Sequence, residues 1–147
     1  MFGVEDPATI EAVRAYVKLL RAHSCVLARL EPLAVGAGLT LTQLGVLEVL
    51  LHKGPLSQRE IGRKVLTSAG NMTDVVDKLQ ARGLVRRDKV AGDRRQVAVA
   101  LTEAGQALIE QVFPRHAADI AAAMRGLGAA ELAQLGGLLR RLGAAAR

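Results

Sequence analysis

Hydrophobic residues recur at helical spacing along the first part of the chain. Over residues 8–35 they repeat every three or four positions with basic residues between them, which predicts a long amphipathic helix. A second, more heavily apolar helix is predicted from about Thr42 to His52, where Gly54 and Pro55 stop it. The chain therefore begins with two helices of different character, the first amphipathic and the second largely buried.

A capping box marks the start of the next helix. Ser57 and Glu60 stand three residues apart, and each side chain can accept a hydrogen bond from the other residue's backbone amide. That helix is expected to be short, ending near Leu66, and Ser68 can then cap a following one. The following helix has an apolar stripe, made of Met72, Val75, Val76 and Leu79, and a polar face, made of Asn71, Thr73, Asp74, Asp77 and Lys78.

The pattern changes from helix to strand at Gly83. Residues 84–90 and 96–101 read as two short strands, and Ala91-Gly92-Asp93 supplies the turn between them. Two short helices joined by a tight turn and followed by a hairpin form a winged helix-turn-helix. The predicted fold class is therefore mainly α with a small β-hairpin wing.

Two further helices close the chain. Thr102 is expected to cap a helix that runs to about Arg125, and Pro114 predicts a kink or break within it. The terminal helices carry long apolar stripes that a lone monomer would leave uncovered, so we expect a homodimer that packs them together. The expected parts of this single intertwined domain are a dimerisation helix at 1–38, a winged lobe at 39–101 and dimerisation helices at 102–147.

The net charge of +6 is concentrated in one segment of the chain. Residues 53–100 hold eleven Lys or Arg against five Asp or Glu, whereas the flanks hold nine of each. Basic side chains that neutralise phosphates release condensed counterions, so such a segment favours a polyanionic partner. The charge indicates double-stranded DNA as the partner of the winged lobe, although a solvated basic face has the same composition.

The polar helix and the hairpin fit the two grooves of DNA. A helix about 10–12 Å wide fits a major groove about 12 Å wide. Arg94 and Arg95, near the hairpin turn, can enter the narrow minor groove, and Asp93 can hold a guanidinium in place. The candidate DNA-contacting residues are Arg63, Lys64, Ser68, Asn71, Thr73, Asp74, Lys78, Arg86, Lys89, Asp93, Arg94 and Arg95.

An ordered series of short motifs between Leu41 and Gly105 resembles the MarR family of bacterial transcriptional regulators. The motifs are Leu41-Thr42-Gln43, Gly54-Pro55-Leu56-Ser57-Gln58-Arg59-Glu60, Gly70-Asn71-Met72-Thr73, Asp77-Lys78-Leu79, Arg82-Gly83-Leu84-Val85, Gly92-Asp93-Arg94-Arg95 and Leu101-Thr102-Glu103-Ala104-Gly105. The resemblance implies a dimer that places residues 68–79 of each lobe in the major groove and each wing in the adjacent minor groove. It also implies that Arg95 is the wing residue nearest the DNA and that Asp93 orients it. Repression from a near-palindromic operator is the expected mode of action.

Asp74 departs from the family pattern, which often has a basic or aromatic residue at this position. A carboxylate is repelled by phosphates, but it can accept a hydrogen bond from cytosine. The same carboxylate can instead pair with Lys78, one helical turn further on. Asp74 is therefore either a specificity determinant or an internal ion-pair partner.

The resemblance also implies a small effector. Relatives bind phenolic or carboxylate ligands between the dimerisation helices and the winged lobes, and the chain looks most similar to the hydroquinone-responsive branch around residues 51–55 and 113–116. An aromatic effector is therefore expected, with a pocket formed by Tyr16, Arg21, His23, Arg29 and His52.

Two other functions compete with an effector-released repressor. Cys25 and His23 suggest a redox- or metal-responsive regulator, but residues two apart on a helix do not share a face and nothing completes a tetrahedral site. A helical interaction protein that does not bind DNA would explain the flanks, but not the position of the charge. The sequence contains neither a phosphate-binding glycine loop nor a nucleophile and base in a recognisable motif, so we expect no enzyme, cofactor or metal. With one cysteine and no long apolar run, the protein is expected to be cytoplasmic, without a membrane partner.

Overall fold

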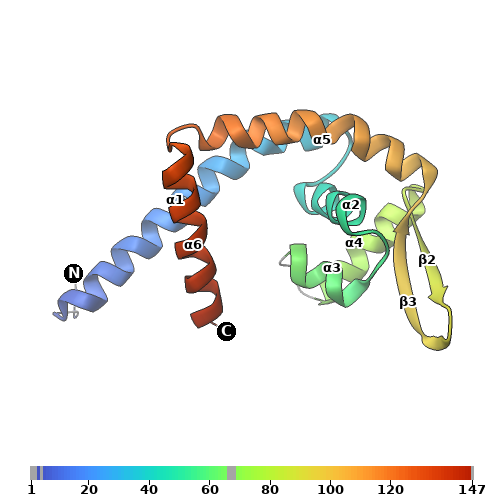
Figure 1. Cartoon of the computed structure of the whole chain (residues 1–147), viewed down its shortest axis with the longest axis horizontal. Helices are drawn as coiled ribbons and strands as arrows, with labels where there is room; N and C mark the ends of the chain where they lie inside the picture. The colour runs from blue at the N-terminus through green and yellow to red at the C-terminus, as the bar shows by residue number, and fades with distance from the viewer. Residues whose placement is uncertain (1–2, 4, 66–68, 147) are drawn as a thin grey trace. The chain divides into compact units, whose positions relative to one another are not determined.

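The computed structural model describes residues 3, 5–65 and 69–146 (Figure 1). It divides into two compact units, one formed by Leu30–Ala117 and the other by Met1–Arg29 with Ala118–Arg147. Two long helices, α1 (Pro7–Gly36) and α5 (Glu103–Met124), contribute residues to both units. The predicted first helix is confirmed.

The unit Leu30–Ala117, called the winged lobe below, contains the predicted helix-turn-helix and wing. Besides the adjoining ends of α1 and α5, its elements are α2 (Leu41–Lys53), β1 (Leu56–Ser57), α3 (Gln58–Val65), α4 (Ala69–Ala81), β2 (Val85–Val90) and β3 (Asp93–Leu101). Strands β2 and β3 form a hairpin that projects beside α3 and α4 (Figure 1). The predicted fold class, mainly α with a small β wing, is confirmed.

One hydrophobic core holds the winged lobe together. All four residues of the stripe predicted on α4, Met72, Val75, Val76 and Leu79, are buried in it. The core extends beyond residues 39–101, because the end of α1 and the start of α5 also pack into it. Those flanking contributions are Ala34, Ile109 and Val112.

The wing is a three-stranded antiparallel sheet in the order β1-β3-β2. Strand β1 was not predicted, because two residues are too few to show an alternating pattern; it pairs Leu56 with Val99. Strand β3 begins at Asp93, three residues earlier than predicted, so the turn is only Ala91-Gly92.

Helix boundaries follow local capping signals. The predicted capping box is confirmed, since Glu60 Oε2 accepts from the Ser57 amide at 2.8 Å and Ser57 Oγ accepts from the Glu60 amide at 3.3 Å. Hydrogen bonds from the Ser57 hydroxyl and amide lower the pKa of Glu60. A second capping box, Thr40 with Gln43, starts α2 and was not predicted.

The Schellman turn after α4 needs glycine at its left-handed position. Gly83 has φ +70°, its amide donates to Gln80 and the Leu84 amide donates back to Leu79. This turn closes the last carbonyls of α4 and directs the chain into β2, as the sequence predicts for Gly83.

The predicted cap of α5 is confirmed, because Thr102 Oγ1 accepts from the Gly105 amide at 3.0 Å. The same hydroxyl donates to the Gly83 carbonyl, which ties the start of α5 to the end of α4. The helix runs through Pro114 without the break that the sequence allowed.

The second unit is built from the terminal helices. It contains α6 (Ala129–Ala145), in which none of the described residues is buried. Large apolar side chains on α1 and in the α6 segment are exposed, as a lone monomer requires. The exposed set in this unit is Val13, Tyr16, Val17, Leu19, Leu20, Leu27, Leu127, Leu138, Leu139 and Leu142.

In the part of the chain that the structure describes, no single helix is long and apolar enough to span a membrane. Helices α1 and α2 reach those limits of length and apolar character only when they are taken together, across a bend of 80°.

Candidate nucleic-acid interface

Helix α4 turns one polar face outward from the winged lobe. Its buried stripe fixes the rotation of the helix about its own axis, because these side chains are all in the core. The exposed positions are those predicted from the sequence: Asn71, Thr73, Asp74, Asp77 and Lys78. Ser68, the predicted cap and DNA contact, lies outside the described residues.

The two acidic side chains of α4 both have cationic partners. Asp74 Oδ2 lies 2.8 Å from Lys78 Nζ, which confirms the ion pair that the sequence offered as one alternative. Both side chains are more than half exposed, so the pair contributes only about 0.3–0.5 kcal/mol. Asp77 Oδ1 lies 2.6 Å from Arg87 Nη2, on the neighbouring strand β2.

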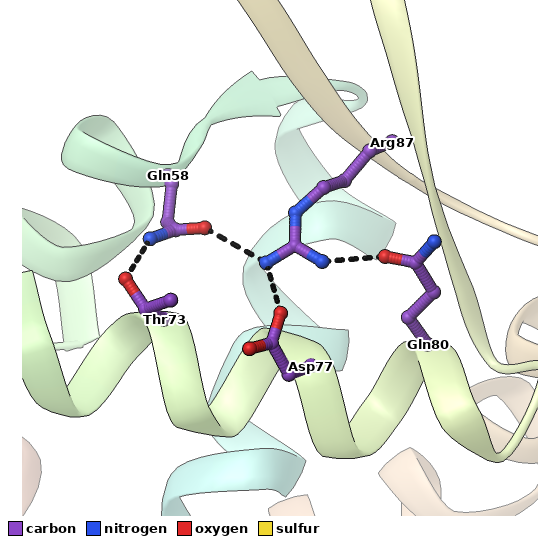
Figure 2. Close-up of polar contacts among 5 residues, drawn as sticks. All are labelled: Gln58, Thr73, Asp77, Gln80 and Arg87. Atoms are coloured by element: carbon purple, nitrogen blue, oxygen red, sulfur yellow. Dashed lines mark hydrogen bonds and ion pairs between the residues drawn. The ribbon is translucent and has the colours of Figure 1, made fainter.

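Arg87 joins the wing to both helices of the helix-turn-helix (Figure 2). Besides Asp77, its guanidinium donates to Gln80 Oε1 on α4 and to Gln58 Oε1 at the first position of α3, the latter at 3.2 Å. The Gln58 side chain in turn donates to Thr73 Oγ1 at 2.6 Å. Five side chains from α3, α4 and β2 thus form one connected polar network, called the Arg87 network below.

Thr73 is both a predicted DNA contact and a member of this network. The hydroxyl oxygen of Thr73 accepts the hydrogen bond from Gln58, and this bond holds the Thr73 side chain in place without DNA. The sequence pattern placed Thr73 on the polar face correctly. It did not indicate that Gln58, fifteen residues earlier, would hold it.

The wing arginines lie in the strand rather than in a loop. Arg94 and Arg95 are exposed at the start of β3, where the strand ladder restricts their backbone. Asp93 Oδ1 accepts from the backbone amide of Arg95 at 2.9 Å. This hydrogen bond fixes the backbone at Arg95, and the role of Asp93 as a partner of a guanidinium stays a prediction.

Arg86 and Lys89, the predicted phosphate contacts on β2, differ in their surroundings. Arg86 Nε donates to Asp88 at 2.8 Å and its Nη1 donates to the Leu101 carbonyl. Arg86 also lines an open cavity of about 450 Å³ together with the first turns of α5. Its neighbour Arg87 contacts α4 instead, through Gln80. Lys89 is exposed, as are Arg63 and Lys64 at the end of α3. The DNA contacts of all these residues stay predictions.

The residues of the predicted effector pocket are exposed in this structure. Tyr16, Arg21, His23 and Arg29 lie along α1, and His52, at the end of α2, packs edge-on against Phe113 with ring centroids 4.8 Å apart. The pocket itself stays a prediction.

Cys25 is a free, exposed thiol on α1, and its neighbour His23 is exposed as well. Among the described residues, no group of three or more His, Cys, Asp or Glu is placed to hold a metal ion.

A helix-turn-helix with a polar second helix, flanked by a basic antiparallel wing, defines the class of winged helix-turn-helix proteins. A sequence model of the MarR family matches residues 37–96. The chain is 33% identical to the HTH-type transcriptional regulator MhqR of Bacillus subtilis, over 92% of this chain and 93% of that protein. The chain therefore belongs to the MarR family, as its motifs predicted, and is a transcriptional regulator rather than an enzyme.

Solved structures agree with this assignment. The crystal structure of a probable transcriptional regulator from Pseudomonas aeruginosa is 34% identical, with a TM-score of 0.75 over 86% of this chain and 94% of that one. A structure of Bordetella bronchiseptica BpsR, whose DNA binding is regulated by 6-hydroxynicotinic acid, is 29% identical, with a TM-score of 0.78 over 88% of this chain and 98% of that one.

Proposed function

We propose that this chain is a sequence-specific DNA-binding repressor that acts as a homodimer on a near-palindromic operator. Helix α4 enters the major groove with its exposed polar face, and the hairpin of β2 and β3 reaches the adjacent minor groove. Two lobes related by a twofold axis then read half-sites about 34–36 Å apart, one turn of the duplex.

The observation that carries this proposal is the distribution of paired and unpaired charge around α4. The carboxylates of Asp74 and Asp77 would repel phosphates, but each is neutralised by a cation within 2.8 Å. Among the described residues, no carboxylate lies within ion-pair distance of the Arg94 or Arg95 guanidinium. Positive charge for phosphates therefore comes from the wing, beside a helix whose two carboxylates are both neutralised.

The exposed leucines of the terminal helices support dimerisation. A monomer that leaves Leu138, Leu139 and Leu142 half exposed on α6 presents an apolar surface of the kind that a second copy buries. A twofold arrangement also matches the symmetry of a palindromic operator.

We also propose that a small aromatic effector releases the repressor, working in the cytoplasm. The relative BpsR, regulated by 6-hydroxynicotinic acid, supports a ligand of this class. On this chain, Tyr16 offers an aromatic ring, and Arg21 and Arg29 offer cations for a carboxylate or phenolate. The effector would act only through a higher affinity for the lobe spacing that does not fit the operator.

The decisive experiment selects DNA from the genome that encodes the protein and then measures binding by fluorescence anisotropy. We expect a palindromic consensus, and a dissociation constant for it at least about a thousandfold below that for a scrambled duplex. Anisotropy that stays flat with every duplex at low salt would contradict the proposal and favour a helical interaction protein. Adding 6-hydroxynicotinic acid or hydroquinone to the complex tests the effector class separately.

A further inference from the structure

The residues of α4 that Arg87 contacts, directly or through Gln58, lie on one side of the helix. Through Gln58 and directly, Arg87 is joined to Thr73, Asp77 and Gln80, which are spaced four and three residues apart and so lie on one side of α4 (Figure 2). The side chain of Arg87 is only 26% exposed, whereas Arg94 and Arg95 on the same wing are exposed. Arg87 is therefore less accessible to a phosphate than these two arginines are.

We propose that Arg87 is a positioning residue that sets the orientation of α4 relative to the wing, and thereby determines how well the protein distinguishes its operator from other DNA. This inference rests on the proposed DNA-binding function. It assigns Arg87 no direct contact with a base or a phosphate.

The geometry of the guanidinium explains why arginine is needed here. Its planar fork donates in several fixed directions at once, and Arg87 uses Nη1 for Gln80 and Nη2 for both Asp77 and Gln58. The core stripe holds one side of α4, and the Arg87 network holds another. With both in place, the exposed face can present its side chains to base edges at only one angle.

A substitution of Asp77 tests this proposal, because simple electrostatics and the positioning role predict opposite changes in operator affinity. Its side chain is 59% exposed on the helix that faces DNA, so simple electrostatics predicts that removing its charge strengthens binding to every duplex. If Asp77 instead orients α4 through Arg87, the same change weakens binding to the operator while binding to scrambled DNA is unchanged or stronger.

The experiment measures dissociation constants of the full-length protein for its selected operator and for a scrambled duplex, each as a function of salt. Arg87→Lys keeps the charge but loses the fork, and we expect it to lower the operator-to-scrambled affinity ratio by about tenfold. Its affinity for scrambled DNA and its salt slope should match wild type, which a lost phosphate contact or a generally less stable lobe would not reproduce.

Asp77→Asn should lower the same ratio by a similar factor, and the double variant should be less than additive, since both changes break one network. Arg82→Lys is the matched control, because Arg82 donates to the Gly38 carbonyl in the same lobe and lies outside the Arg87 network. It should leave the ratio unchanged.

An unaltered ratio in Arg87→Lys, or tighter operator binding by Asp77→Asn, would overturn the positioning role. If circular dichroism shows that Arg87→Lys is unfolded, the direction in which Asp77→Asn changes operator affinity decides alone. A wild-type protein that does not discriminate between the duplexes would instead reject the proposed function itself.

Discussion

Gly105 is a position where a single added side-chain atom would collide with the backbone of the winged lobe. A Cβ built on this residue would lie 1.9 Å from the Leu84 carbonyl oxygen, which is backbone and cannot swing aside. That carbonyl also accepts from the Thr102 amide. The start of α5 can therefore pack directly on the turn between α4 and β2 only because residue 105 has no side chain.

We predict that Gly105→Ala destabilises the protein by about 1–3 kcal/mol, because the backbone must shift to relieve the overlap. A chain of this size should then lose several degrees of melting temperature, at about 2–4 °C per kcal/mol, in a thermal scan followed by circular dichroism. Gly70→Ala, within α4 and with open space around its Cβ, is the control and should melt at or slightly above wild type. Equal melting of Gly105→Ala and wild type would show that the close approach is relaxed in solution.

At the scale of elements, the wing combines two kinds of basic residue. Lys89 on β2 is exposed at a position suited to the phosphate backbone, and Arg95 on β3 stands beside Asp93, whose carboxylate fixes its backbone amide. A fixed backbone limits where the long arginine side chain can reach, which suits a specific contact in a narrow minor groove.

Arg95→Ala should therefore weaken operator binding by roughly 1–3 kcal/mol, as expected for a specific contact. Lys89→Ala should weaken all sequences alike and reduce the salt slope by about 1, as expected for a phosphate contact. Anisotropy titrations at several salt concentrations measure both quantities. Operator affinity that is the same for Arg95→Ala and wild type would remove Arg95 from the interface.

At the scale of the whole molecule, the terminal helices and the winged lobe bury apolar surface differently. The lobe has a core of fully buried side chains, whereas α6 has no buried residue among those described. The terminal helices accordingly lack within one chain the packing that stabilises the lobe, which is the physical basis for expecting a second copy.

We predict that Leu139→Glu shifts the protein towards monomers, because a charge would be placed in the apolar contact between subunits. The dimer dissociation constant, measured by sedimentation velocity, should rise by at least about tenfold, or 1.4 kcal/mol. Val97→Glu is the matched control: Val97 and Leu139 are both 42% exposed, but Val97 lies on the wing. A Leu139→Glu variant that sediments as wild type would contradict the proposed interface.

The sequence by itself determined the features that depend on residues near one another in the chain. The α4 stripe, the caps at Ser57 and Thr102 and the Gly83 turn follow from spacings of a few residues, because helix geometry fixes which neighbours meet. The same spacing offered the Asp74–Lys78 pair as one of two alternatives. The family motifs were readable for the same reason, since they are local.

Tertiary structure alone decided which distant side chains meet. Arg87 and Gln58 are 29 residues apart, and nothing in the spacing indicates that strand alternation turns Arg87 towards α4 while Arg86 bonds to Leu101. The short strand β1 likewise exists only because β3 offers it a partner. Such contacts depend on how packed elements are oriented, and that orientation is fixed by the whole core rather than by any one segment.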